Sequence, residues 1–267
     1  MIQMNTTIQI EKKANIAWIW LNRAEVRNAF NDVMIGELTE ALVTLGEDSS
    51  VKVVVLAGRG PTFCAGADLN WMKRMARYTY EENLNDAAGL ARMLEVLYRL
   101  PKPTIARISG HAYAGGMGLV AACDIAVASE ETQFCLSEVK IGLIPATIGP
   151  YVVNAMGPRA ARRYMLSAER FNAASALRLG LVHEVVDTQD LDEMVITFTD
   201  HFIKGGAGAH RDTKSLIELI EQSDLNRALI DETAVRIART RASDEGKEGI
   251  RSFLEKRKPD WLTEDNN

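Results

Sequence analysis

Two loops rich in small residues offer bare main chain that could stabilise a negatively charged oxygen. Ala65-Gly66-Ala67 and Ala114-Gly115-Gly116 each follow an apolar run with strand character. A helix that begins at the second loop would leave its first amides without partners inside the helix, at the positive end of the helix dipole. Two convergent amides would stabilise the enolate that forms when a proton leaves, or a nucleophile adds, next to a thioester. Glycines alone are more typical of a tight packing turn between a strand and a helix.

Glu138 is the candidate for moving a proton in such a reaction. It lies inside the largely apolar stretch 132–141, and an apolar setting raises a carboxyl pKa toward the range that suits proton transfer. The structural alternative is a buried glutamate that pairs with Arg162 or Arg163. The sequence leaves both interpretations open.

Other residue types suggest less. Neither the four histidines nor the three cysteines of the chain have the spacing of metal ligands or of a disulfide framework, so we predict no metal site. Ser137 lacks the Gly-x-Ser-x-Gly context of a nucleophile elbow, and no dinucleotide-binding fingerprint fits. Asp124 is expected to end the helix before it or to fix a turn.

Composition limits the classes of protein that fit. The chain has 267 residues, 47% hydrophobic and 25% charged, with a net charge of −5, which is ordinary for a globular protein. The acidic balance argues against a nucleic-acid partner. No apolar run reaches the roughly 20 residues of a membrane span, and no signal pattern opens the chain. We expect a cytoplasmic protein with reduced cysteines.

The elements that would position these residues alternate between strand and helix. Apolar runs at 51–57 and 104–108 predict buried strands, each placed just before one of the two loops. An apolar stripe from Met34 to Leu45 predicts a helix capped by Asn31 or Asp32. A hairpin is expected over 7–21 and a long helix over 83–100. This order indicates an α/β fold with crossover connections.

The composition changes near residue 189, where we place a boundary. Residues 1–189 carry every predicted strand, and residues 190–267 carry only helical patterns, at about 191–203, 213–222, 225–241 and 245–257. A helical tail of this kind often packs across a subunit interface.

The motifs together resemble the crotonase, or enoyl-CoA hydratase/isomerase, superfamily. The matching stretches are Phe63–Leu69, residues 109–118, Cys123-Asp124 and residues 133–145. The resemblance implies a right-handed spiral of ββα turns with a CoA-thioester site, followed by a helical region that builds homotrimers, often paired into hexamers. It also implies an acyl-CoA thioester as the substrate and no cofactor beyond the CoA that the substrate carries.

The resemblance implies roles for single residues. The amides of Ala67 and Gly115 would form an oxyanion hole, and Glu138 would deliver a proton at the substrate α-carbon. The CoA and thioester channel would be lined by Ala65, Asp68, Leu69, Asn70 and Gly116. Phe253 and Lys256, on the last helix, would meet CoA, often from a neighbouring subunit.

The chain departs from the family pattern at Gly118, where the hydratases usually carry a first glutamate. One glutamate, at 138, is the pattern of the family's Δ3,Δ2-enoyl-CoA isomerases. Residues 68–74 and 136–146, however, look most like a bacterial subgroup assigned as methylglutaconyl-CoA or carboxygeranoyl-CoA hydratases of leucine and acyclic-terpene breakdown. That subgroup also has glycine at the first position, so Glu138 alone would position water, with help from the Ala146 amide.

The sequence therefore predicts reversible hydration of a branched or carboxylated 2-enoyl-CoA, such as 3-methylglutaconyl-CoA. The alternative is a Δ3,Δ2-enoyl-CoA isomerase that uses the same glutamate, and a more remote one is a non-catalytic CoA-binding or RNA-binding relative. Arg74 or Arg77 could contact a distal carboxylate, or either could be an ordinary exposed helix charge.

Overall fold

A large, mainly parallel sheet forms the body of the molecule. The computed structural model describes residues 6–262, and within them this sheet has six strands in the order β1-β2-β3-β4-β6-β9. Only β1 and β2 run antiparallel, which confirms the predicted hairpin. All residues of β3 are buried, as expected for a strand covered on both faces. The strands are β1 (Ile8–Lys13), β2 (Ile16–Leu21), β3 (Val53–Gly58), β4 (Thr104–Ile108), β6 (Ile125–Ser129) and β9 (Glu184–Val186).

A second, smaller sheet contains β5 (His111–Tyr113), β7 (Gln133–Cys135) and β8 (Phe171–Asn172). β5 follows β4 and β7 follows β6 after a few residues, so each turn of the chain adds one strand to each sheet and then enters a helix. The expected α/β spiral of ββα turns is therefore confirmed. None of the three small-sheet strands was predicted, because segments of two or three residues are too short to show a period of two.

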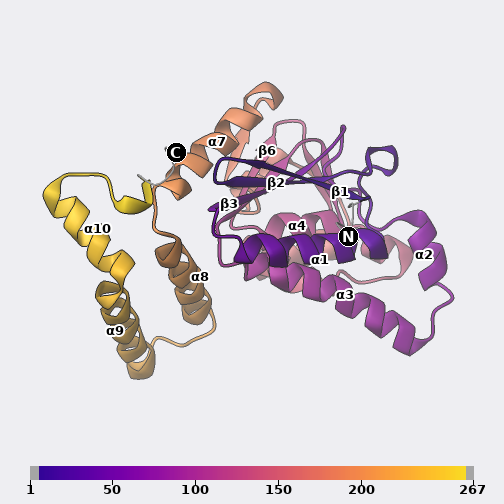
Figure 1. The fold of residues 1–267 in the computed structure, drawn as a ribbon. Coiled ribbons are helices and arrows are strands. Elements are labelled where there is room, and N and C mark those ends of the chain that lie inside the picture. Colours follow the sequence, from indigo (N-terminus) through magenta and orange to yellow (C-terminus); the bar gives the residue numbers. More distant parts are fainter. Residues whose placement is uncertain (1–5, 263–267) are drawn as a thin grey trace. The chain divides into compact units, whose positions relative to one another are not determined.

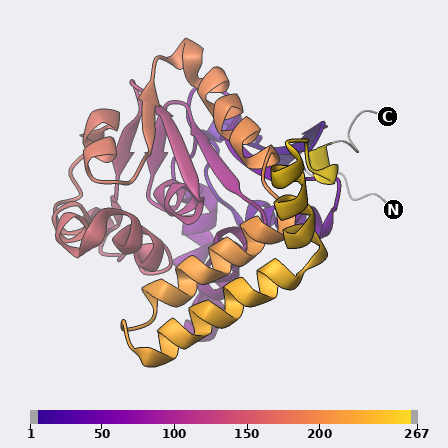
Figure 2. The same cartoon turned by 90° about the vertical axis from the view of Figure 1, so that its left-hand side faces the viewer.

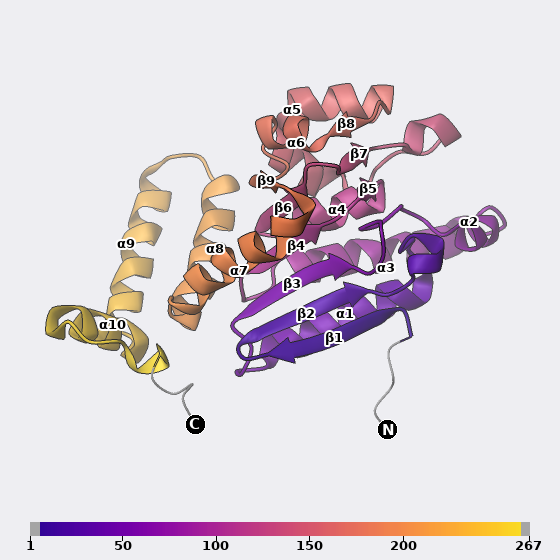
Figure 3. The same ribbon diagram turned by 90° about the horizontal axis from the view of Figure 1, so that it is seen from above.

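Two long helices, α1 (Asp32–Glu47) and α3 (Tyr80–Tyr98), lie side by side along one face of the large sheet (Figures 1 and 3). Asn31 caps α1 by accepting a hydrogen bond from the Met34 amide at 2.9 Å, as predicted. α3 begins three residues before its predicted start, because Thr79 and Glu82 form a capping box there.

The remaining helices of the first unit are shorter or bent. They are α2 (Leu69–Met75), α4 (Gly115–Ala122), α5 (Gly149–Ser167) and α6 (Ala173–Arg178). α5 bends at Gly157, which has a φ of 75° inside the helix. Residues 158–166 alone have a helical pattern in the sequence, because Pro158 and the break at Gly157 interrupt the pattern before them. Asn172 caps α6 by accepting a hydrogen bond from the Ser175 amide.

The chain divides into two compact units between Phe198 and Thr199. The division lies inside α7 (Leu191–Ile203), later than the boundary at 189/190 that the change of composition suggested. The reason is that the first turns of α7 bury Leu191 and Val195 completely, so this helix begins as part of the first unit. The chain ends 1–5 and 263–267 lie outside the described residues.

The second unit contains helices and no strand within the part of the chain that the structure describes. α8 (Ala207–Glu221) and α9 (Arg227–Ala242) run side by side, and α10 (Asp244–Glu255) follows (Figure 2). The Glu245 carboxylate accepts hydrogen bonds from the amides of Gly208 at 2.9 Å and Ala209 at 2.8 Å. A side chain of α10 thereby satisfies free amides at the start of α8.

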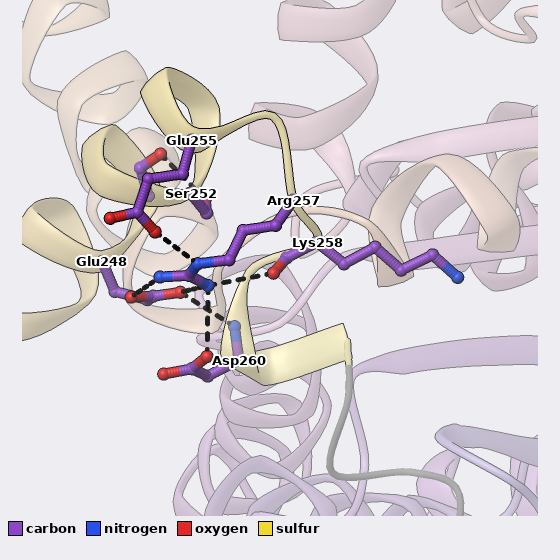
Figure 4. A network of polar contacts seen from close by, with 7 residues as sticks. Glu248, Ser252, Glu255, Arg257, Lys258 and Asp260 are labelled. Atoms are coloured by element: carbon purple, nitrogen blue, oxygen red, sulfur yellow. Dashed lines mark hydrogen bonds and ion pairs between the residues drawn. The ribbon is translucent and has the colours of Figure 1, made fainter.

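Arg257 organises the segment after α10 (Figure 4). Its guanidinium contacts the carboxylates of Glu248 at 2.6 Å, Glu255 at 2.7 Å and Asp260 at 3.3 Å. Hydrogen bonding to Arg257 lowers the pKa of Glu248 to about 2.

No helix within residues 6–262 combines the length and the apolar character needed to cross a membrane.

Candidate active site

The two small-residue loops meet through a short parallel bridge between Cys64 and Ala112. The Cys64 amide donates to the His111 carbonyl at 3.1 Å, and the Tyr113 amide donates to the Cys64 carbonyl at 2.9 Å. A Cβ built on Gly116 would lie 2.7 Å from the Cys64 carbonyl oxygen, so only glycine allows this approach. The bridge places the segments just before residues 67 and 115 next to each other.

The peptide of Ala67 is held in a defined orientation by Phe30. The Phe30 amide donates to the Gly66 carbonyl, and the Asp68 amide donates to the Phe30 carbonyl, each at 2.7 Å. Phe30 and Ala67 thus form a parallel bridge, in which the Ala67 amide points away from Phe30. No residue of the described chain accepts a hydrogen bond from that amide.

The Gly115 amide is free for a different reason. Gly115 begins α4, and no acceptor for its amide is found among residues 6–262. The preceding residue, Ala114, has φ 47° and ψ −117°, a conformation that costs a non-glycine residue about 1–3 kcal/mol. Its own amide donates to the Cys135 carbonyl at 2.8 Å. The turn is therefore both a close-packed strand-to-helix turn and a source of unpartnered amides, so the two interpretations of the glycines coexist.

Glu138 follows β7 and opens a short 3₁₀ helix, Glu138–Ile141, which ends at Gly142 in a left-handed conformation with φ 75°. Its Oε2 atom is buried, and no residue in the described part of the chain forms a hydrogen bond to it. Burial raises the pKa of Glu138, and a hydrogen bond from its own backbone opposes that effect.

The structural alternative for Glu138 is wrong. Arg163 pairs with Glu169 at 2.7 Å, and Arg162 is exposed on α5. A buried carboxylate oxygen without a partner is costly in a folded protein. Neither arginine therefore satisfies the Glu138 carboxylate.

Strand direction brings these groups to one edge of the small sheet. The segment at Cys64 pairs in parallel with Ala112 of β5, and β5 runs parallel to β7. Ala67, Gly115 and Glu138 each follow the carboxyl end of one of these three segments, and the carboxyl ends of parallel strands share an edge. Two free amides and one protonatable carboxyl at one edge are the groups that enolate chemistry needs.

The position of the missing first glutamate is filled by an apolar side chain. A Cβ built on Gly118 would lie 2.9 Å from Ile148 Cβ and 3.6 Å from Leu94 Cδ2. Ile148 is buried just before α5. At Gly118, α4 therefore packs against the residue that precedes α5, with no room for an acidic side chain. The sequence carried no signal for Ile148, because the two residues meet only through the fold.

Asp68 is tied to its own surroundings by its carboxylate. Its carboxylate accepts hydrogen bonds from the amides of Asn70 at 2.7 Å and Trp71 at 3.1 Å, which caps α2, and it pairs with Arg23 at 2.8 Å. The side chain is therefore committed to the protein itself. Leu69 and Asn70, which follow it, are exposed.

The expectation for Ala146 changes. Its amide donates to the Ile144 carbonyl at 2.8 Å, so this amide already has an acceptor within the chain. Ala65 is half-buried and Gly116 is buried, which leaves Ala65 as the more accessible of these two predicted channel residues.

The remaining predicted contacts lie apart from this edge in the sequence. Phe253 on α10 is 81% exposed, and Lys256 ends α10 in a left-handed conformation with φ 54°. Arg74 pairs with Asp32 at 2.6 Å. Asp124 accepts hydrogen bonds from the amide and hydroxyl of Thr104, so its role is structural, but it holds the start of β4 rather than ending α4 or fixing a turn.

Metal and thiol chemistry have no support at this edge. Within residues 6–262, no group of three or more His, Cys, Asp or Glu side chains is arranged to hold a metal ion. Burial raises the pKa of Cys64 to about 12, although a hydrogen bond from the Gly66 amide opposes it, so this thiol stays protonated at neutral pH.

Comparisons with known proteins agree with the geometry. The model of the enoyl-CoA hydratase/isomerase family matches residues 11–264. A crystal structure of an enoyl-CoA hydratase from Shewanella pealeana is 43% identical, with a TM-score of 0.95 and coverage of 97% of both chains. A crotonyl-CoA hydratase from Syntrophomonas wolfei is 30% identical over 96% of this chain and 98% of its own. A mevalonyl-coenzyme A hydratase from Aspergillus fumigatus is 33% identical over 92% of this chain and 91% of its own.

Proposed function

Because the chain belongs to the enoyl-CoA hydratase/isomerase family and is an enzyme of the hydratase class, we propose that it hydrates a 2-enoyl-CoA reversibly. In this proposal Glu138 is the only acidic side chain that moves a proton. The observation that carries this proposal is the buried, unpartnered Oε2 of Glu138. It lies in the segment that follows β7, at the edge where two free amides are also found.

The proposed chemistry uses one carboxylate twice. Ionised Glu138 accepts a proton from a water molecule while the water oxygen forms a bond to C3 of the enoyl group. The π electrons move onto the thioester oxygen, where the amides of Ala67 and Gly115 donate to the enolate. The enolate then collapses, and Glu138 returns its proton to C2. A raised pKa suits a group that must both accept and donate.

The acyl group is the finer part of the proposal. We propose a branched or carboxylated 2-enoyl-CoA, such as 3-methylglutaconyl-CoA, which rests on the resemblance of residues 68–74 and 136–146 to that subgroup. Since Arg74 is paired with Asp32, exposed Arg77 is the better candidate for a distal carboxylate. A panel of plain, branched and carboxylated enoyl-CoAs, assayed with wild type and Arg77→Gln, tests this. A preference for plain chains, unchanged by Arg77→Gln, would refute it.

Isomerisation is the second candidate, and the contact between Gly118 and Ile148 favours it. With an apolar wall in place of the first glutamate, Glu138 could move one proton between two carbons with no water added. Crotonyl-CoA and a 3-enoyl-CoA, assayed side by side, separate the two reactions. Hydration removes the ultraviolet absorbance of the conjugated enoyl thioester, whereas isomerisation creates it.

Self-association belongs to the proposal as well. We propose that the helical second unit builds a homotrimer or hexamer and that Phe253 and Lys256 reach a CoA bound by a neighbouring subunit. The exposed apolar side chains of α10, Ile250, Phe253 and Leu254, support this. Light scattering should give three or six times the mass of the chain, and a monomer at micromolar concentration would contradict it.

A further inference from the structure

Phe30 touches both loops that carry the free amides. Its backbone bridges residues 66 and 68 with two hydrogen bonds of 2.7 Å, on either side of Ala67. Its side chain is 1% exposed. One residue, outside both loops in the sequence, therefore fixes the peptide that contains the first free amide.

The ring of Phe30 packs against the second loop. A Cβ built on Gly115 would lie 2.8 Å from Phe30 Cε2 and 2.9 Å from Cδ2, closer than real carbon–carbon contacts. The ring of Phe30 therefore packs against Gly115, beside the direct contact between the two loops at Gly66 and Ala114.

Arg23 ties both sides of the Phe30–Ala67 bridge together. Its Nη1 donates to the carbonyl of Ala29, the residue before Phe30, at 2.6 Å. Its Nη2 donates to Asp68, the residue after Ala67, at 2.8 Å. The two charged side chains are 16% and 8% exposed, so water screens the pair little.

We propose that Arg23, Phe30 and Asp68, which we call the donor clamp, are positioning residues that set the separation and direction of the amides of Ala67 and Gly115. This inference rests on the proposed function, in which those amides hold the enolate. Oxyanion stabilisation depends on geometry that is correct to within about 0.5 Å. A displacement of about 1 Å can lower a rate by about 100-fold.

The first test is Asp68→Asn. Asparagine keeps an oxygen that can cap α2 through the amides of Asn70 and Trp71, but its NH₂ group would face the Arg23 guanidinium, donor against donor. We expect kcat to fall about 10- to 100-fold while KM changes by less than about threefold. The kcat of Arg23→Lys should fall by a similar factor, because one ammonium group does not reproduce a guanidinium that donates to two separate acceptors.

The matched control is Asp192→Asn, which breaks the ion pair between Asp192 and Arg107 in the same unit. It should leave kcat within about twofold of wild type. Urea unfolding of each variant gives the folded fraction, to which the rates are normalised.

The second test uses the contact between the ring and Gly115. Gly115→Ala should push the ring away and lower kcat, and Phe30→Val, which removes Cδ2 and Cε2, should lower it by loosening the site. The double variant places the new Cβ in the vacated space, so its kcat should exceed that of Gly115→Ala by about tenfold. Independent losses would instead multiply. This comparison decides the proposal even where Asp68→Asn does not fold.

The outcomes separate the clamp from the proposed function. An active wild type, with Asp68→Asn and Arg23→Lys at wild-type kcat and no rescue in the double variant, would overturn the clamp and leave the function intact. A wild type that converts neither 2-enoyl-CoA nor 3-enoyl-CoA would overturn the proposed function instead.

Discussion

Two segments of the first unit each carry a buried or partly buried carboxylate just after a parallel strand pairing. The environments of the two carboxylates are opposite. Asp68, in segment 63–71, accepts two amide hydrogen bonds and pairs with Arg23. Glu138, in segment 133–142, has a buried Oε2 with no partner among residues 6–262. Burial acts to raise the pKa of both carboxyls. At Asp68, hydrogen bonds outweigh burial and lower the pKa, whereas at Glu138 the pKa stays raised.

The difference in hydrogen bonding indicates different roles for the two carboxylates. Hydrogen bonds from Arg23, Trp71 and Asn70 lower the pKa of Asp68 despite its burial, so it stays ionised and holds α2 and the adjacent Ala67. Nothing comparable stabilises the ionised form of Glu138. The satisfied carboxylate of Asp68 supports the backbone, and we propose that the unsatisfied carboxylate of Glu138 takes and returns a proton.

The largest expected effect is at the unsatisfied carboxylate. Glu138→Gln keeps the shape of the side chain but removes its proton transfer, so kcat on the best enoyl-CoA should fall about 10²- to 10⁴-fold. Glu169→Gln, which alters an exposed carboxylate paired with Arg163, is the control and should stay near wild type. Turnover of Glu138→Gln within about threefold of wild type would end the catalytic assignment.

The next largest effect is expected at Gly118, the position where the family's hydratases are expected to carry a first glutamate. Gly118→Ala forces a Cβ against Ile148 and should lower the free energy of unfolding by about 1–3 kcal/mol in urea titrations. Gly36→Ala in α1 is the matched control, because nothing lies within 4 Å of its added Cβ. That variant should gain about 0.5–1 kcal/mol. Equal effects of the two changes would show that position 118 has room for a side chain.

The two carboxylates should also give opposite pH dependences of stability. Because the pKa of Glu138 is raised above 4.5 in the fold, the folded state binds more protons, and its stability falls as pH rises through that window. Glu138→Gln should therefore raise the melting temperature at neutral pH. The gain should vanish once the pH is below 4.5, the ordinary pKa of a glutamate.

Asp68 works the other way. Its pKa lies below 3.8 in the fold, so its contribution is present above that value and is lost as pH falls through the folded pKa. Asp68→Asn should lower the melting temperature at neutral pH and less so in acid. If the change in melting temperature depended on pH in the same way for both variants, the contrast between the two carboxylates would be wrong.

The smallest effect tests the rejected pairing of Glu138. Arg163→Gln removes an exposed ion pair with Glu169, and kcat should stay within about twofold of wild type at every pH. A shifted pH profile for this variant would mean that Arg163 interacts with Glu138 after all.

Much of this molecule follows from the sequence because the signals are local. Apolar runs identified β3 and β4, Asn31 indicated the start of α1, and the small-residue loops together with Glu138 supplied the candidate site, whose roles remain predictions. Periodicity, caps and turn residues act over a few positions, so one chain read in order contains them.

The tertiary structure decided what distant residues do to one another. The pairing of Cys64 with Ala112, the placement of Ile148 against Gly118 and the contacts of Phe30 with both loops join positions that no local pattern links. The ion pair between Asp68 and Arg23 likewise joins positions that are far apart in the sequence. Which carboxylate is satisfied depends on groups that only the folded chain brings within hydrogen-bonding distance.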